Sequence, residues 1–252
     1  MQALVLDFDG VISDSVRESF TVSLRSYLDL RPDSSLAERE REDLYPAFLE
    51  LMPLGNRAED YGTAVTAIEA GRTLADQESY DAFRAVQDPE WLERYHRRFY
   101  EVRTEMAGSD PGGWLKLMRP YAPFLDLLRR RAGSVVYAIA TSKDLQSVEA
   151  SLAAYGVSDL FSRNLIMDKE AGASKTAHLQ RLRELLGLDY PAMTFVDDKV
   201  NHLDAVAPLG ARCALATWGY NGSREHELAQ QRGYLLCTLD EAERQLFDAA
   251  ER

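Results

Sequence analysis

Two pairs of aspartates are the residues of this sequence best suited to chemistry. Asp7 and Asp9 occur early in the chain, two residues apart. Asp197 and Asp198 are adjacent and occur late in the chain, and each pair follows an apolar segment. Four carboxylates in one place repel one another unless a cation joins them. Mg²⁺ prefers hard oxygen ligands and retains waters that a phosphate oxygen can replace, so the pattern predicts a magnesium site where the four aspartates meet.

Each pair also has a simpler interpretation. Asp9-Gly10 is a common turn dipeptide, and Asp197 and Asp198 can be two unrelated loop residues. In extended backbone, however, residues i and i+2 point to the same side, so Asp7 and Asp9 can converge on one spot. If the strands are parallel, the second pair lies at the same carboxyl edge, which is where open α/β sheets bind ligands. We therefore favour a single functional site.

Two further polar segments follow apolar runs. Thr141 and Ser142 come where a strand-like run ends and a helix begins, so backbone N–H groups and the Thr141 hydroxyl are suited to bind phosphoryl oxygens. A helix N-cap is the alternative interpretation. Lys175 lies in the first turn of another predicted helix, where the helix dipole disfavours a cation. Lys175 is therefore either a solvated surface residue or a functional one.

The remaining pattern predicts the elements that position these residues. Short apolar runs typical of buried strands occur at residues 2–8, 134–140, 163–167, 193–197 and 213–217. Helical periodicity lies between the later runs and ends at Gly156 and at Gly187. This alternation predicts an α/β fold with a Rossmann-like parallel sheet covered by helices on both faces.

One long segment interrupts this alternation. Residues 16–119 show helical periodicity and no strand signal, and proline and glycine divide them into several helices. Asp88, Pro89 and Glu90 form the clearest predicted helix start, with a cap, a first-turn proline and a first-turn acid. The sequence thus predicts an all-α domain inserted after the first strand, with residues 1–15 and 120–252 forming the α/β domain.

Composition narrows the classes of partner. The chain of 252 residues carries 29 Lys and Arg against 41 Asp and Glu, a formal net charge of −12. This charge argues against nucleic acid and against anionic membrane surfaces as partners. No apolar run is long enough to cross a membrane and no secretory leader is recognised, so we expect a cytoplasmic protein. Cys213 and Cys237 lack the spacing of zinc ligands, and we interpret them as buried thiols.

Taken in order, these segments resemble a known family. Asp7-Phe8-Asp9-Gly10-Val11, Thr141, Lys175 and Asp197-Asp198 resemble the four motifs of the haloacid dehalogenase superfamily. The helical insert resembles the α-helical cap of the first insertion type. Residues 140–143 and 216–221 are similar to the phosphoglycolate phosphatase-like branch.

The resemblance implies a set of roles. Asp7 would be the nucleophile and Asp9 the general acid and base of a phosphatase that acts through an aspartyl-phosphate. Mg²⁺ would be held by Asp7, Asp9 and Asp198, with Asp197 as a second ligand or an outer acceptor. The residues expected to bind the phosphate are Thr141, Ser142, Lys175 and Gly10. The substrate would be a small phosphomonoester, phosphoglycolate-like or a sugar phosphate, and the protein a monomer or a homodimer.

The sequence departs from the family pattern at two points. Thr176, rather than proline, follows Lys175, so Lys169 stays open as the motif lysine. Asp197 stands where the phosphatase branch commonly has glycine, so either Asp197 or Asp198 can be the direct metal ligand. By position we favour Asp198.

Three other functions are considered beside the phosphatase. A dehalogenase of this fold uses the first aspartate alone, so Asp9 and Asp197-Asp198 argue against it. A phosphohexomutase shares every core motif and stays open. A non-catalytic protein that binds a phosphate ligand would be expected to lack a motif, and none is lost.

Four other polar residues have weaker signals. Arg57 lies in a loop-like stretch, where it either meets the substrate or is exposed, and His96 is expected to be structural or solvated. Asn201 and His202 follow the last motif, and we expect Asn201 to support its loop.

Overall fold

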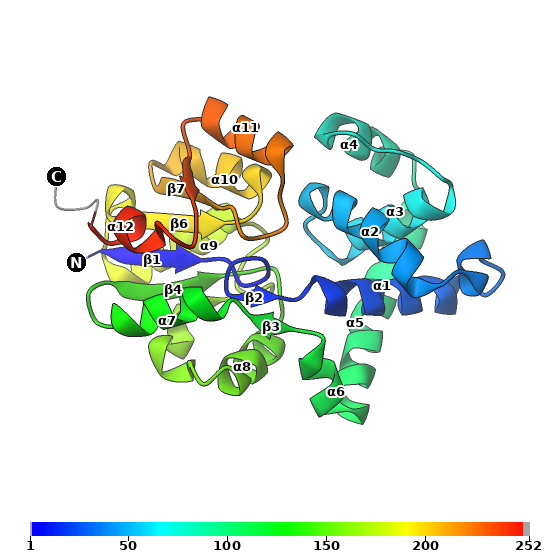
Figure 1. Cartoon of the computed structure of the whole chain (residues 1–252), viewed down its shortest axis with the longest axis horizontal. Helices are drawn as coiled ribbons and strands as arrows, with labels where there is room; N and C mark the ends of the chain where they lie inside the picture. The colour runs from blue at the N-terminus through cyan, green and yellow to red at the C-terminus, as the bar shows by residue number, and fades with distance from the viewer. Residues whose placement is uncertain (1, 249–252) are drawn as a thin grey trace. The chain divides into compact units, whose positions relative to one another are not determined.

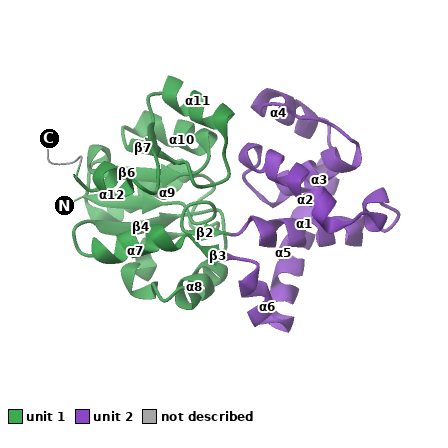
Figure 2. Ribbon diagram, viewed as in Figure 1, with its two compact units in different colours: residues 1–14, 119–252 green, residues 15–118 purple. Residues whose placement is uncertain are grey.

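The protein consists of two compact units, which Figure 2 shows in green and purple. The computed structural model describes residues 2–248. Residues 1–14 and 119–252 make up one unit, here called the core unit, and residues 15–118 make up the other, here called the helical unit.

The core unit is built on a six-stranded sheet in which every pair of neighbouring strands is parallel (Figure 1). The strand order is β5-β4-β1-β6-β7-β8, the order of a Rossmann sheet. The strands are β1 Ala3–Leu6, β4 Val136–Ala140, β5 Ile166–Met167, β6 Met193–Asp197, β7 Arg212–Ala216 and β8 Leu235–Cys237. In this order the chain reverses direction across the sheet between β1 and β6, and the carboxyl ends of those strands form the expected ligand crevice.

Alternating side chains of β1 show how the two faces are buried. Leu4 and Leu6 pack into one apolar layer, and Ala3 and Val5 pack into the other. The first layer is closed by α7 Ala122–Arg130, α8 Leu145–Ala154 and α12 Ala242–Leu246. The second layer is closed by α9 Lys175–Leu186, α10 Val200–Val206 and α11 Ser223–Gln231. The predicted α/β fold with helices on both faces is confirmed.

The first strand is shorter than the sequence predicts. Strand β1 ends at Leu6 because the carbonyl of Phe8 accepts hydrogen bonds from Ile12 and Ser13, both at 2.9 Å, and turns the chain out of the sheet. Asp9 therefore lies beyond the end of β1, where it forms an isolated bridge with Ser13. The predicted strand over residues 163–167 is also shorter, because residues 163–165 form a 3₁₀ turn.

Three strands escape the sequence prediction. Strand β8 adds to the edge of the sheet after Gly233, and β2 Ser13–Asp14 pairs antiparallel with β3 Arg119–Pro120. Strands of two or three residues are too short to show a period. The β2–β3 pair lies at the two points where the chain of the core unit is interrupted.

The described residues of the helical unit form helices and no strand. The helices are α1 Val16–Leu30, α2 Arg41–Leu51, α3 Ala58–Glu69, α4 Gln77–Ala85, α5 Pro89–Ser109 and α6 Pro111–Lys116. Helix α5 begins as predicted, with the Asp88 carboxylate accepting the N–H of Glu90 at 3.0 Å. Within residues 2–248 the structure also has six 3₁₀ turns, at residues 35–38 and 52–54 in this unit and at residues 158–160, 163–165, 190–192 and 207–209 in the core unit.

A buried ion pair joins three helices of this unit. Arg103 of α5 donates to both carboxylate oxygens of Glu18 of α1, at 2.7 and 3.0 Å. The indole N–H of Trp114 in α6 donates to the same carboxylate at 3.2 Å. Buried charges are tolerated when paired and hydrogen-bonded in this way. The pair therefore ties the first helix of the unit to its last two.

Two further predictions concern apolar segments and thiols. No helix within residues 2–248 has the length and apolar character needed to cross a membrane. Cys213 and Cys237 are buried, as predicted, and burial raises the pKa of each thiol to about 12. Both are protonated at neutral pH and serve packing.

Candidate active site

Asp7 lies directly after β1, at the carboxyl edge of the sheet. Its backbone N–H donates to the carbonyl of Val196 at 2.9 Å, which keeps β1 in register with β6. Its Oδ1 accepts from the N–H of Phe8 and from Nζ of Lys175, both at 2.7 Å. Burial raises the pKa of Asp7 to about 7 against the opposing charge of Lys175, and the charges of Asp197 and Asp9 add to the rise. The carboxylate of Asp7 is thus fixed in orientation, and its pKa depends on the neighbouring charges.

Lys175 opens α9 and is buried. Its Nζ lies 2.7 Å from Asp7 Oδ1, 2.9 Å from Asp197 Oδ2 and 2.7 Å from the carbonyl oxygen of Ala140. Burial disfavours its charge, but Asp197 and Asp7 outweigh burial and raise its pKa. These contacts explain why a lysine is tolerated at the N-terminus of α9, where the helix dipole disfavours a cation. Lys169, the other candidate, pairs with Glu170 at 3.3 Å and its side chain is 30% exposed.

Asp197 is fully surrounded by donors. Its Oδ2 pairs with Lys175, and its Oδ1 accepts from the N–H of Lys199 at 2.9 Å and from Nδ1 of His202 at 3.0 Å. Burial disfavours the charged carboxylate, but His202 and Lys175 outweigh burial and hold the pKa of Asp197 below its usual range. Burial lowers the pKa of His202 to about 4, so a neutral imidazole donates to Asp197 at pH 7. His202 therefore lies at the site, next to the last motif.

Asp198 has a different environment. Its Oδ2 accepts from the N–H of Tyr220 at 2.8 Å, and its carbonyl accepts from the amide of Asn221 at 3.0 Å. Its Oδ1 is buried and has no hydrogen-bond partner among residues 2–248. Burial and the charge of Asp197 raise its pKa well above the usual range. An orphaned buried carboxylate oxygen of this kind can be satisfied by a bound cation or water.

Two glycines allow Asp198 to approach the turn after β1. Gly10 has φ +83°, and a Cβ added there would lie 2.2 Å from Asp198 Oδ2. A Cβ added at Gly219 would lie 2.3 Å from the Cβ of Asp198. The N–H of Gly10 donates to the carbonyl of Ser13 at 2.8 Å, so it closes the turn. The approach of Asp198 thus requires Gly10 to lack a side chain, a feature separate from the phosphate-binding role that the family resemblance implies for it.

The loop after β4 provides the third side of the site. The N–H of Thr141 donates to the carbonyl of Met167 at 2.8 Å, and its hydroxyl oxygen accepts from the N–H of Lys143 at 3.1 Å. Ser142 is half-buried beside it. Nζ of Lys143 lies 3.1 Å from Asp9 Oδ1. Asp9 is thus in contact with Lys143, as Asp7 is with Lys175.

These residues fit a hard divalent cation. Ligand atoms of Asp7, Asp197 and His202 lie within 4.8 Å of one another. Lys175, Lys199 and His202 already occupy the oxygens of Asp197, whereas the buried Oδ1 of Asp198 has no hydrogen-bond partner within residues 2–248. Carboxylate oxygens without a soft ligand suit Mg²⁺.

Some contributors were not predicted from the sequence. Lys143 received no role, and neither did Tyr220 and Asn221, although residues 216–221 stood out as family-like. The amide of Asn221 also donates to the carbonyl of Ala216 at 2.9 Å, so it holds the end of β7 to Asp198. The support expected from Asn201 is not seen at its Oδ1, which has no hydrogen-bond partner in the described part of the chain.

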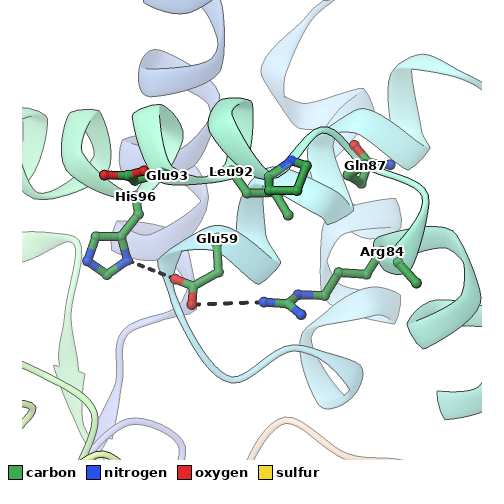
Figure 3. A pocket seen from close by; sticks show the side chains of 8 residues that line it. Glu59, Arg84, Gln87, Leu92, Glu93 and His96 are labelled. Atoms are coloured by element: carbon green, nitrogen blue, oxygen red, sulfur yellow. Dashed lines mark hydrogen bonds and ion pairs between the residues drawn. The ribbon is translucent and has the colours of Figure 1, made fainter.

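The helical unit contains a separate pocket of about 470 Å³ (Figure 3). Glu59 lies between His96, whose Nδ1 is 2.8 Å away, and Arg84 at 4.0 Å. Leu92 and Pro89 supply apolar lining. The half-exposed His96 thus has a structural contact, and Arg57 is an exposed residue at the start of α3. Because these polar groups pair with one another, the pocket does not point to a particular ligand.

Several solved structures of other proteins have a similar fold. The chain is similar in structure to a "predicted phosphoglycolate phosphatase" from Haemophilus somnus 129pt, with 20% identity, 96% of each chain covered and a TM-score of 0.64. It is also similar to a haloacid dehalogenase-like family hydrolase from Streptococcus pneumoniae, with 14% identity, 96% of each chain covered and a TM-score of 0.65. A third similar structure is a "predicted phosphatase" from Clostridium acetobutylicum, with 13% identity, 98% of each chain covered and a TM-score of 0.62.

A search of curated proteins finds no match to the chain. The family model for haloacid dehalogenase-like hydrolases matches residues 1–210. This match spans the two aspartate pairs, the loop after β4 and Lys175. The chain is therefore a hydrolase that belongs to the haloacid dehalogenase-like family.

Proposed function

We propose that this hydrolase is a Mg²⁺-dependent phosphatase that cleaves a small phosphomonoester through an aspartyl-phosphate on Asp7. The observation that carries the proposal is the ammonium group of Lys175 between Asp7 and Asp197. The neighbouring residue Asp198, whose Oδ1 has no hydrogen-bond partner within residues 2–248, supports the metal site. The similar structures from Haemophilus somnus and Clostridium acetobutylicum, both described as phosphatases, support the choice of reaction.

The reaction has two steps. The carboxylate of Asp7 attacks phosphorus while the bond to the leaving oxygen breaks, and Asp9 gives that oxygen a proton. A water then attacks the phosphorus of the aspartyl-phosphate, and the Asp9 carboxylate takes a proton from it. Phosphate leaves and both aspartates return to their starting states. Two hydrogen bonds to Oδ1 hold the Asp7 carboxylate for this attack.

Cations and hydroxyls hold the phosphoryl group. Thr141, Ser142 and Lys175 are the residues we assign to its oxygens, and Gly10 is left out because its N–H closes the turn. Mg²⁺, when bound, would supply positive charge against the phosphoryl oxygens. Asp7, Asp198 and the carbonyl of Asp9 would hold it, and Asp197 would instead fix Lys175. In a protein of net charge −12, an anionic substrate depends on such local cations.

We further propose that the core unit carries out the chemistry and that the helical unit is the cap that selects the substrate. Residues 15–118 are inserted directly after the turn that carries Asp9 and Gly10. A cap that closes over a bound substrate would exclude water from the reaction.

A phosphatase screen tests the proposal. Purified protein would be incubated with small phosphomonoesters, with and without Mg²⁺, and released phosphate measured. We expect Mg²⁺-dependent release that the Asp7→Asn variant loses while its circular dichroism stays unchanged. Release that survives this substitution, or no release from any substrate, would contradict the proposal. Isomerised substrate without free phosphate would identify a mutase.

A further inference from the structure

Lys143 is a buried lysine to which the sequence motifs give no role. Its side chain is 0% exposed, and its Nζ lies 3.1 Å from Oδ1 of Asp9. A buried ammonium is costly unless it is paired. The ammonium group of Lys143 is buried against Asp9, the residue proposed as general acid and base. This placement indicates a role for Lys143 beyond packing.

The backbone around Lys143 is fixed at several points. Its N–H donates to the Thr141 hydroxyl oxygen at 3.1 Å, and its carbonyl accepts from the N–H of Lys169 at 3.3 Å. The next residue, Asp144, caps α8 by accepting the N–H of Ser147 at 2.9 Å. Strand β4 also pairs directly with β1 in the sheet. The ammonium group is therefore delivered to Asp9 by a rigid loop rather than by a mobile surface chain.

The chemistry of an ammonium group then constrains Asp9. An ammonium has three donors and no acceptor, so Oδ1 of Asp9 accepts from Lys143. A proton carried by Asp9 belongs on its other oxygen, Oδ2. The Asp9 side chain is 27% exposed, so it remains within reach of a substrate while its lysine partner is enclosed.

We propose that Lys143 is a positioning residue that holds the Asp9 carboxyl group and directs its transferable proton to Oδ2. In the first step that proton passes from Oδ2 to the leaving oxygen as the phosphorus–oxygen bond breaks. In the second step Oδ2 takes a proton from the attacking water. The inference rests on the phosphatase activity proposed above and assigns Lys143 no contact with the phosphoryl group.

The dependence of rate on the leaving group tests this role. An alkyl phosphate releases a strongly basic oxygen and needs an acid, whereas 2,4-dinitrophenyl phosphate does not. The pre-steady-state burst of dinitrophenolate isolates the first step. We expect Lys143→Met to slow the alkyl substrate by about 100-fold or more and to change the burst rate by less than about tenfold. Lys143→Arg, which keeps a donor-only cation, should restore part of the lost rate.

A double-mutant cycle with Asp9→Asn shows whether the two residues act together. If Lys143 acts through Asp9, the double variant is no slower on the alkyl substrate than Asp9→Asn alone. Losses that multiply would contradict the inference.

Other outcomes separate the alternatives. Equal losses on both substrates would indicate a structural role and overturn the inference. Weaker inhibition by inorganic phosphate with unchanged leaving-group dependence would make Lys143 a phosphate ligand and also overturn it. A wild-type protein inactive on every phosphomonoester would remove the proposed function, and this inference with it.

Discussion

The ammonium group of Lys175 separates two buried carboxylates that would otherwise repel each other. With Lys175 replaced by Met, Asp7 and Asp197 lose their shared cation. We expect Lys175→Met to lower kcat/KM by at least about 100-fold, a typical effect of removing a preorganised donor at such a centre. Phosphate release at saturating Mg²⁺ provides the measurement.

Lys169→Met is the matched control for that experiment. Lys169 pairs with Glu170 and has a partly exposed side chain, so its removal should leave kcat/KM within about twofold, as for most surface substitutions. The reverse ranking of the two variants would show that Lys169 is the motif lysine.

Asp198 is the residue that we expect to govern metal affinity. Because its Oδ1 has no hydrogen-bond partner within residues 2–248, Asp198→Asn should weaken Mg²⁺ binding by more than about tenfold. Calorimetric titration of the protein with Mg²⁺ alone measures this without reference to turnover. Asn201→Ala is the control and should retain the affinity of the wild type. Equal affinity of Asp198→Asn and wild type would assign the metal elsewhere.

At the scale of residues, the sequence pattern pointed to the main candidate residues of the site but not to the residues that contact and hold them. Asp7, Lys175 and Asp198 combine a reactive side chain with a position after a strand or at a helix start, and both features are visible in sequence. Lys143 and Asn221 act through contacts with distant segments, Lys143 with Asp9 and Asn221 with Asp198. Only the folded chain reveals such contacts.

At the scale of elements, the Glu18–Arg103 pair determines how firmly three helices are joined. Glu18→Gln would remove the carboxylate that pairs with the buried guanidinium of Arg103. Breaking one partner of such a pair costs about 3–5 kcal/mol, and we expect a loss of about this size. Urea unfolding followed through tryptophan fluorescence is suitable, since Trp91 and Trp114 lie in the helical unit.

An exposed ion pair of the same unit provides the comparison. Arg17 pairs with Glu42 at 2.9 Å, but the Glu42 side chain is 77% exposed. Glu42→Gln should change the free energy of unfolding by less than about 1 kcal/mol. Similar effects of the two substitutions would mean that the Glu18–Arg103 pair has no special stabilising role.

The elements themselves were predictable where they are long and periodic. Helix α5 has a cap, a first-turn proline and a buried face that includes Trp91, Tyr95 and Phe99, so its start was identified from sequence. The end of β1 was not identified from sequence, because it is determined by the turn around the carbonyl of Phe8 rather than by hydrophobicity. Strand β8 was missed because three residues carry no period.

At the scale of the whole molecule, a buried histidine makes stability depend on pH. Nε2 of His178 lies 3.1 Å from the carbonyl oxygen of Gly172, and burial, with the charge of Lys175, lowers the His178 pKa to about 4. An unfolded histidine titrates near 6.5, so the unfolded chain binds more protons than the folded one between the two values. Stability should therefore fall as the pH drops below about 6.5.

The His178→Gln variant isolates this contribution. A full proton taken up on unfolding lowers the free energy of unfolding by about 1.4 kcal/mol per pH unit. Urea unfolding at pH 7 and at pH 5 should show a smaller difference for the variant than for the wild type. An unchanged difference would mean that His178 does not contribute to acid sensitivity.

The pairing of β2 with β3 has a consequence for how such proteins diversify. Ser13 and Asp14 lie beside Pro120 and Arg119, so the chain leaves and re-enters the core unit through adjacent strands. Because β2 and β3 hold the two points of interruption together, the inserted segment needs only to span the short gap between them. During evolution, that segment can be exchanged or resized without repacking the sheet, and a lineage can acquire new substrates while inheriting its chemistry intact.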